Sequence, residues 1–130
     1  MQKVFFDLNE NLNISNLEAI ISNYTVCVID FYADWCGPCI RLGKTIEENI
    51  NKENFYQNIE RTIICDKKLS DKINKIAFVK INVDYHQEIA QIYKIKSIPH
   101  IIFYKNNVLQ PQIINGCDYD GVIENIKKLL

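Results

Sequence analysis

The sequence contains no long hydrophobic run, no large excess of charge of either sign, no internal repeat and no low-complexity segment. No apolar stretch approaches the roughly 18 residues that a membrane-spanning helix needs. The formal net charge of −1 over 130 residues gives no electrostatic reason to expect nucleic acid or an anionic membrane as a partner. With 48% apolar and 24% charged residues, the composition is ordinary for a globular protein, and the length suits one domain over residues 1–130.

The cysteines form only one close pair, and the N-terminus lacks the features of a signal peptide. The segment MQKVFFDLNENLN has one lysine followed mainly by polar residues, without an apolar centre or a small-residue cleavage site. The five cysteines are an odd number with only one close pair, whereas a disulfide-stapled secreted domain is normally smaller and denser in cysteine. We therefore expect the protein to work in a reducing compartment. The cytoplasm is the first expectation, and an organelle is the alternative if a targeting segment has been removed.

The close cysteine pair lies in the stretch WCGPC, residues 35–39. Zinc usually needs four ligands, commonly from two close pairs, and the sequence has no second C-x-x-C. The histidines His86 and His100 are not spaced as a ligand pair, so we predict no metal site. A purely structural disulfide across so short a loop would constrain little chain. A redox-active pair is the favoured interpretation.

The neighbouring segments predict different roles for the two thiols. Residues 25–33 (TVCVIDFYA) are apolar on both faces and predict a central buried strand, and residues 39–50 predict a helix. Cys36 then lies at a helix N-terminus, where free N–H groups and the helix dipole favour a thiolate. Cys39 lies about one turn further along and is more buried. We therefore predict that Cys36 attacks a partner's disulfide and that Cys39 resolves the mixed disulfide.

The remaining patterns complete an α/β order of elements. A possible capping box at Ser15 and Glu18 predicts a helix start. Further strands are predicted at residues 3–8, 78–84, 100–104 and 111–115, and further helices around residues 17–21, 89–93 and 122–130. The order β-α-β-α-β-α-β-β-α predicts a sheet covered by helices on both sides.

Several motifs together resemble the thioredoxin family. The stretches VIDFYADWCGPC, KINVD and SIP, with the late Gly116, resemble thioredoxin over nearly the whole chain outside one insertion. The resemblance implies a thioredoxin fold, with a mixed five-strand sheet and helices on both faces. It also implies a dithiol–disulfide oxidoreductase that reduces protein disulfides and has no bound cofactor. A thioredoxin reductase drawing on NADPH would return it to the reduced state.

The resemblance also assigns roles behind the cysteine pair. Asp30 is similar to the family's buried carboxylate, whose pKa burial should raise and which takes the proton from Cys39. Lys80 is similar to the partner of that carboxylate. The alternatives for these residues are a solvated aspartate at a strand end and an ordinary surface lysine.

A second group of residues is implied to bind substrate. The Ile98-Pro99 bond resembles the family's cis-proline loop, which lies against the cysteine pair, and Gly116 resembles the glycine of the substrate groove. Within the motif, Trp35 offers a flat apolar surface. The full expected substrate-binding set is Trp35, Gly37, Pro38, Ile98, Pro99 and Gly116.

The chain departs from the family at several positions. Residues 51–75 are an insertion between the active-site helix and the next strand, and their apolar positions recur at helical spacing. This helical insertion is either a docking surface for a protein partner or a tolerated surface elaboration. His100 stands where threonine is usual, either near enough to Cys36 to stabilise its thiolate or as a strand residue without a redox role. Ile40 and Lys44 replace the usual lysine and proline.

The three cysteines outside the motif have separate interpretations. Cys27 is expected to be an inert core residue, and Cys65 lies in the insertion. Cys117 follows Gly116 and is either a site of regulatory oxidation or a small neutral residue.

Two alternative functions remain beside the reductase. One is an oxidase or isomerase of a secretory compartment, although a Gly-Pro spacer resembles the reducing branch of the family. The other is a binding or scaffold subunit of a larger assembly that docks through residues 51–75.

Overall fold

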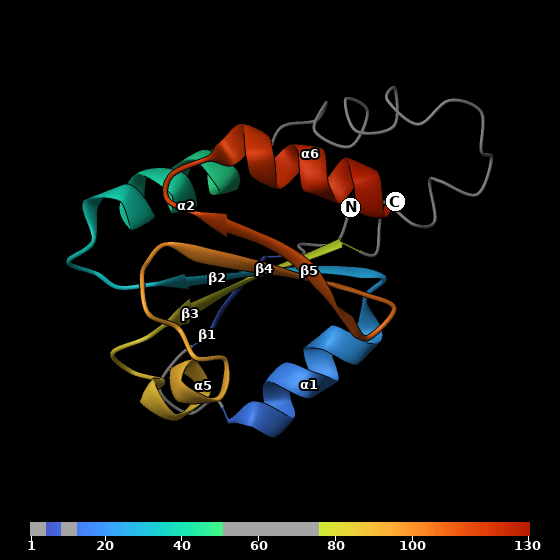
Figure 1. The fold of residues 1–130 in the computed structure, drawn as a ribbon, viewed down its shortest axis with the longest axis horizontal. Helices are drawn as coiled ribbons and strands as arrows, with labels where there is room; N and C mark the ends of the chain where they lie inside the picture. Colours follow the sequence, from blue (N-terminus) through green and yellow to red (C-terminus); the bar gives the residue numbers. More distant parts are fainter. Residues whose placement is uncertain (1–4, 9–12, 51–75) are drawn as a thin grey trace.

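The chain forms a mixed five-stranded sheet with helices on both faces (Figure 1). The structure is a computed structural model that describes residues 5–8, 13–50 and 76–130. The strands are β1 (Phe5–Leu8), β2 (Val26–Tyr32), β3 (Ile76–Asn82), β4 (His100–Lys105) and β5 (Val108–Asn115). The helices are α1 (Ile14–Asn23), α2 (Gly37–Ile50), α5 (Gln87–Ile92) and α6 (Tyr119–Leu129). The predicted fold class is confirmed, whereas the predicted helical insertion at residues 51–75 lies outside the described residues.

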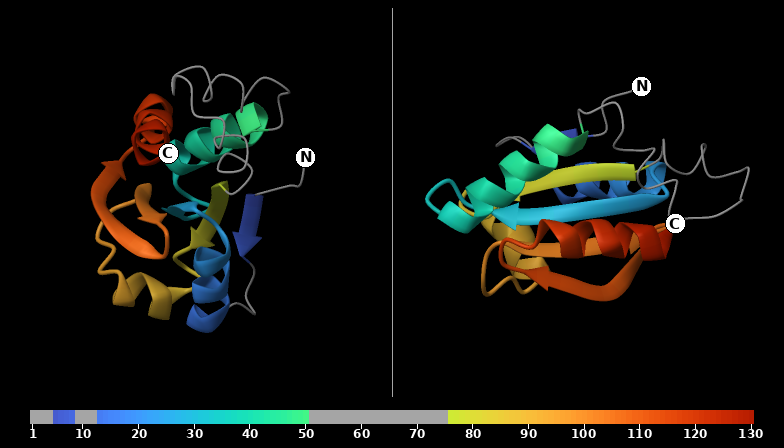
Figure 2. Two further views of the ribbon diagram at one scale, coloured as in Figure 1. Left: turned by 90° about the vertical axis from the view of Figure 1, so that its right-hand side faces the viewer. Right: turned by 90° about the horizontal axis from the view of Figure 1, so that it is seen from above.

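Strand β2 lies at the centre of the sheet. The strand order is β1-β3-β2-β4-β5, in which β3 pairs in parallel with β1 and β2, while β4 pairs antiparallel with β2 and β5. All seven residues of β2 are buried, as its apolar sequence predicts. The views in Figures 1 and 2 show α2 and α6 on one face and α1 and α5 on the other. Alternate β2 side chains therefore enter two separate cores.

The two cores divide the apolar residues by face. Val26 and Val28 pack with residues of α2 and α6, including Leu42 and Ile126. On the opposite face, Cys27, Ile29 and Phe31 pack with Leu17 and Ile21 of α1 and Ile89 of α5. A strand buried on both faces packs against helices above and below it. This packing fixes the position of the C-terminal end of β2, from which the cysteine motif continues.

Edge strand β5 begins three residues earlier than the sequence predicts. Val108 and Leu109 are exposed at 61% and 49%, so the alternation of burial that marks a half-buried strand is weak there. Pro111 lies within the strand, and the register between β4 and β5 shifts between Ile102 and Tyr104. Proline has no N–H for a sheet ladder and is tolerated on an edge strand or at a bulge, which is its position here.

The N-terminus of α1 uses a different capping box from the predicted one. The Asn13 side chain accepts a hydrogen bond from the Asn16 N–H, and the Asn16 side chain accepts one from the Asn13 N–H, both at 3.0 Å. The prediction of a cap at Ser15 is wrong, because Ser15 lies inside the first turn of the helix. Asparagine oxygens perform the same reciprocal capping that a serine and glutamate would.

Helix α5 ends in a Schellman motif with a lysine in the left-handed conformation. The Lys94 N–H donates to the Gln91 carbonyl, and the Ile95 N–H donates to the Ala90 carbonyl, both at 3.0 Å. Lys94 has φ of 56°. Glycine is usual at this position, because a Cβ is strained in the left-handed region. The turn leads directly into the loop that contains Pro99.

Lys94→Gly should therefore stabilise the fold. Removing the Cβ relieves a left-handed strain of about 1–2 kcal/mol, and the greater freedom of glycine in the unfolded chain offsets part of it. We expect the free energy of unfolding in urea to rise by roughly 0.5–1 kcal/mol. Lys94→Ala is the matched control, because it removes the charge and keeps the Cβ. Equal stabilisation by both variants would contradict the backbone explanation.

Candidate active site

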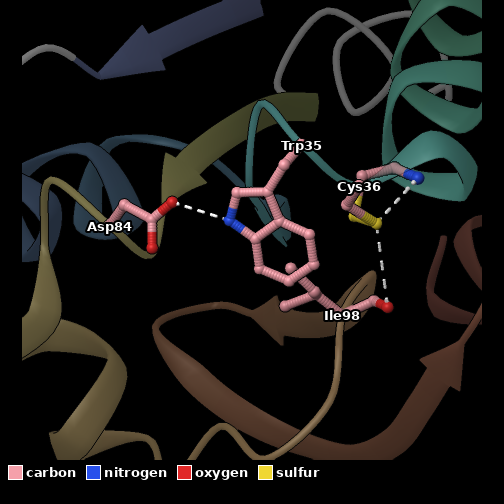
Figure 3. Close-up of a disulfide and its surroundings, with 5 residues drawn as sticks. Trp35, Cys36, Asp84 and Ile98 are labelled. Carbon is pink, nitrogen blue, oxygen red and sulfur yellow. Dashed lines mark hydrogen bonds between the residues drawn. A yellow bond between two sulfur atoms is a disulfide. The ribbon is translucent and has the colours of Figure 1, made fainter.

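The cysteine pair lies where β2 gives way to α2 (Figure 3). Cys36 directly precedes the helix, and its carbonyl accepts the hydrogen bond of the Ile40 N–H at 3.1 Å. A disulfide joins Cys36 to Cys39, with the two Cα atoms 5.2 Å apart. The Cys39 N–H donates to Cys36 Sγ at 3.2 Å. The first turn of α2 therefore directs a backbone donor, together with the positive end of the helix dipole, at the Cys36 sulfur.

The two cysteines differ in burial in the predicted direction. Cys36 is 5% exposed and Cys39 is fully buried. They form a small cluster with Tyr32 and Ala33, against which Val83 and Ile98 pack. Only Cys36 therefore retains an exposed edge, and the apolar surroundings strengthen electrostatic effects on its sulfur.

The loop before β4 lies beside this edge. The Ile98-Pro99 peptide bond is cis, and Cys36 Sγ lies 3.9 Å from the Ile98 carbonyl oxygen (Figure 3). The Gly116 N–H donates to the Pro99 carbonyl at 3.1 Å, and Gly116 has φ of 86°. The structure thus brings the implied loop and the implied glycine together next to the cysteine pair.

Trp35 forms the exposed side of the site. Its side chain is 71% exposed, yet its indole Nε1–H donates to Asp84 Oδ2 at 2.9 Å (Figure 3). Gly37 and Pro38 are also exposed, in the first turn of α2. Sequence reasoning missed the contact of Asp84, although this residue ends the KINVD stretch. The hydrogen bond holds a flat apolar surface beside Cys36.

An open pocket of about 500 Å³ lies next to the cluster of the cysteine pair. It shares Val83 with that cluster. The other lining residues come from α5 and the loop after it: Gln87, Ala90, Gln91, Lys94, Ile95 and Lys96. Its lining therefore combines apolar side chains with polar and charged ones.

Asp30 and Lys80 lie behind the pair as register partners on β2 and β3. Asp30 is 3% exposed, so it is not a solvated strand-end residue. Both residues line one small cavity with Gly43 and Ile46 of α2, the helix that carries Cys39. Lys80 Nζ also lies 4.1 Å from the centroid of the Tyr32 ring, a contact that sequence reasoning missed.

The other cysteines and His100 lie in different surroundings. Burial raises the pKa of the Cys27 thiol to about 12, which makes it inert at neutral pH. Cys117 is an exposed free thiol, and Cys65 lies outside the described residues.

The His100 ring packs edge-on against Phe31, with 6.3 Å between the two ring centroids. Burial lowers the pKa of His100, and its side-chain hydrogen bond with Asn115 partly offsets this, so the neutral ring is favoured.

Within the described ranges, no three histidine, cysteine, aspartate or glutamate side chains are grouped so that they could hold a metal ion. In the same part of the chain, no helix has the length and apolar character needed to cross a membrane.

Comparisons with known proteins agree with this geometry. The sequence matches the family model for thioredoxin over residues 9–128. It is 36% identical over 115 residues to the thioredoxin of Mycoplasmoides gallisepticum, covering 88% of this chain and 95% of that protein. It is 34% identical over 125 residues to a thioredoxin of Neurospora crassa, covering 92% of this chain and 85% of that protein.

The fold is also similar to that of a solved structure, the thioredoxin Mala s 13 of Malassezia sympodialis. The TM-score is 0.69 at 23% identity, and the match covers 98% of this chain and 95% of that one. At this identity the likeness supports the fold, while the family model and the closer relatives carry the assignment. The chain therefore belongs to the thioredoxin family of dithiol–disulfide oxidoreductases.

Proposed function

We propose that the protein works as a reductant of disulfide bonds in other proteins, with Cys36 as the attacking thiol. The observation that carries this proposal is the hydrogen bond from the Cys39 N–H to Cys36 Sγ at 3.2 Å. A backbone donor at a helix N-terminus stabilises a thiolate, and the thiolate is the nucleophile in disulfide exchange. The family resemblance supports regeneration by a thioredoxin reductase drawing on NADPH, in a reducing compartment such as the cytoplasm.

The reaction proceeds in two exchanges. The Cys36 thiolate attacks one sulfur of the partner's disulfide, a mixed disulfide forms, and the partner's other sulfur leaves as a thiolate. Cys39 then loses its proton and attacks Cys36 Sγ. The Cys36–Cys39 disulfide forms and the partner's second sulfur leaves. Two electrons pass from the cysteine pair to the partner, and the reductase later restores them to the pair.

Asp30 is the proposed acceptor of the Cys39 proton. Its carboxyl group is almost fully buried and lines a cavity with Gly43 and Ile46, so it faces the helix on which Cys39 lies. Because Cys39 is fully buried, bulk water cannot take its proton directly, and a positioned side chain is needed. Lys80 is the proposed electrostatic partner of Asp30.

The proposed substrate surface surrounds the exposed edge of Cys36. Trp35 and the first turn of α2, with Gly37 and Pro38, form one side. The backbone of Ile98 and Pro99, with Gly116, forms the other. An extended segment of the partner would lie between these sides, with its disulfide over Cys36 and its flanking residues in the pocket that includes Val83.

A coupled assay tests the reaction class. Insulin reduction with NADPH and thioredoxin reductase should show rapid turnover by the wild-type protein and none by Cys36→Ser, because the attacking sulfur is gone. Cys117→Ser, which alters the exposed free thiol, should retain turnover. Absence of wild-type turnover by a folded protein would favour a scaffold role, and a markedly less negative reduction potential would favour an oxidase or isomerase.

Cys39→Ser should trap partners as mixed disulfides. Serine is close to cysteine in size, so the fold should persist, but its hydroxyl cannot displace a thiolate and the covalent intermediate is not resolved. Trapped partners should appear on a non-reducing gel and disappear with dithiothreitol. Cys36→Ser should trap nothing. Equal trapping by Cys36→Ser would place the nucleophile at another cysteine.

Asp30→Asn should slow release of the reduced partner more than the initial attack. Asparagine keeps the size of the side chain but cannot accept the Cys39 proton. Loss of a positioned base costs roughly 10²-fold or more, so single-turnover kinetics should show the mixed disulfide accumulating. The matched control is Asp34→Asn, an exposed aspartate next to the motif, which should leave both steps unchanged. An unchanged second step in Asp30→Asn would remove Asp30 from proton transfer.

A further inference from the structure

An aromatic ring of the cysteine cluster contacts a lysine ammonium. Tyr32 is 9% exposed and packs in the same buried cluster as Cys36 and Cys39. Lys80 Nζ lies over the Tyr32 ring, 4.1 Å from its centroid. A cation within about 6 Å of an aromatic centroid is attracted by the ring quadrupole, and more strongly where water is excluded. The ring therefore attracts the ammonium at the end of the Lys80 side chain.

Helix α2 bounds the lysine from another direction. A Cβ placed on Gly43 would lie 3.3 Å from Lys80 Nζ and 3.5 Å from its Cε, so the helix backbone itself limits the side chain. Lys80 thus ends between the Gly43 backbone and the Tyr32 ring. The cavity at this point is lined by Asp30, Gly43 and Lys80 together with the apolar residues Val28, Ile46, Phe78 and Val79.

Among the described side chains, the titratable groups nearest Lys80 come from β2. From β2 the titratable groups are Asp30, its register partner, and the phenol of Tyr32. On β1 the backbone register partner of Lys80 is residue 7. Helix α2 contributes Gly43 and Ile46 to this cavity, which carry no charge. Asp30 is the carboxylate that shares the cavity with the ammonium, so the position of Nζ acts directly on Asp30.

We propose that Tyr32 is a positioning residue whose ring holds the Lys80 ammonium beside Asp30. The inference rests on the proposed function, in which Asp30 accepts the Cys39 proton. A nearby positive charge stabilises the carboxylate, and only the carboxylate accepts a proton. With the ring absent, Nζ moves toward water, the carboxylate loses that stabilisation, and a higher pH is needed to keep Asp30 ready as a base. Tyr32 thereby sets the pH range of partner release through Lys80 and Asp30, and it takes no part in the proton transfer itself.

The test is the pH dependence of partner release in single-turnover experiments with a mixed-disulfide substrate. Tyr32→Leu should raise the midpoint of the profile by up to about 1 pH unit, the lower end of the effect of a neighbouring opposite charge. Tyr32→Phe keeps the ring face and should restore the wild-type midpoint. Lys80→Met should raise the midpoint at least as far as Tyr32→Leu. Lys44→Met removes an exposed positive charge from α2 and should leave the midpoint unchanged.

A double-mutant cycle separates positioning from packing. In the Lys80→Met background, Tyr32→Leu should add no further shift, because the group on which the ring acts is gone. The same shift in both backgrounds, or a Tyr32→Phe shift equal to that of Tyr32→Leu, would overturn the inference. Tyr32→Met serves if Tyr32→Leu does not fold, since it also lacks a ring.

The outcomes also separate this inference from the proposed function. If the midpoint of the pH profile shifts in Lys80→Met but not in folded Tyr32→Leu, the role of Tyr32 is rejected and the role of Lys80 stands. An unchanged midpoint in Lys80→Met rejects both the Asp30–Lys80 proton role and this inference. Wild-type insulin turnover, measured separately, reports on the reductase activity itself.

Discussion

The burial of β2 between β3 and β4 is the constraint on which the site depends. A strand with every side chain buried cannot shift along its neighbours, because a one-residue slip would exchange the two faces and move Asp30 from the α2 side to the α1 side. The Val83 N–H donates to the Tyr32 carbonyl at 2.8 Å and extends this pairing to the end of the strand. The point at which Cys36 leaves the sheet and α2 begins is thereby fixed by the core.

The site is assembled from four separate parts of the chain. Trp35 and Asp84 are 49 positions apart, yet their hydrogen bond joins the motif to the loop after β3. Gly116 joins the end of β5 to the loop of Pro99 through one backbone hydrogen bond. Each contact is individually modest, at about 1 kcal/mol. Their combined effect is to surround one sulfur with oriented backbone groups while its neighbour stays buried.

Much of this arrangement follows from local sequence. The apolar run of β2, the spacing of Cys36 and Cys39 and the proline after Gly37 predict a buried strand, a helix N-terminus and two unequal thiols. The contacts of Trp35 with Asp84 and of Tyr32 with Lys80 could not be predicted, because they join residues whose side chains meet only through the sheet register. The left-handed conformation of Lys94 could not be predicted either, since glycine is the usual residue in that conformation. The cap at Asn13 was missed because asparagines replace the usual serine and glutamate.

The irregular edge strand has a consequence for behaviour at high concentration. Val108, Leu109 and Ile113 are apolar and about half exposed or more, and a regular edge carrying them would be a template for a strand of another molecule. Pro111 leaves the strand with one N–H fewer, and the register shift beside it makes the strand irregular. Pro111 and the register shift therefore make this edge a poorer template for a strand of another molecule than its exposed apolar side chains alone would suggest.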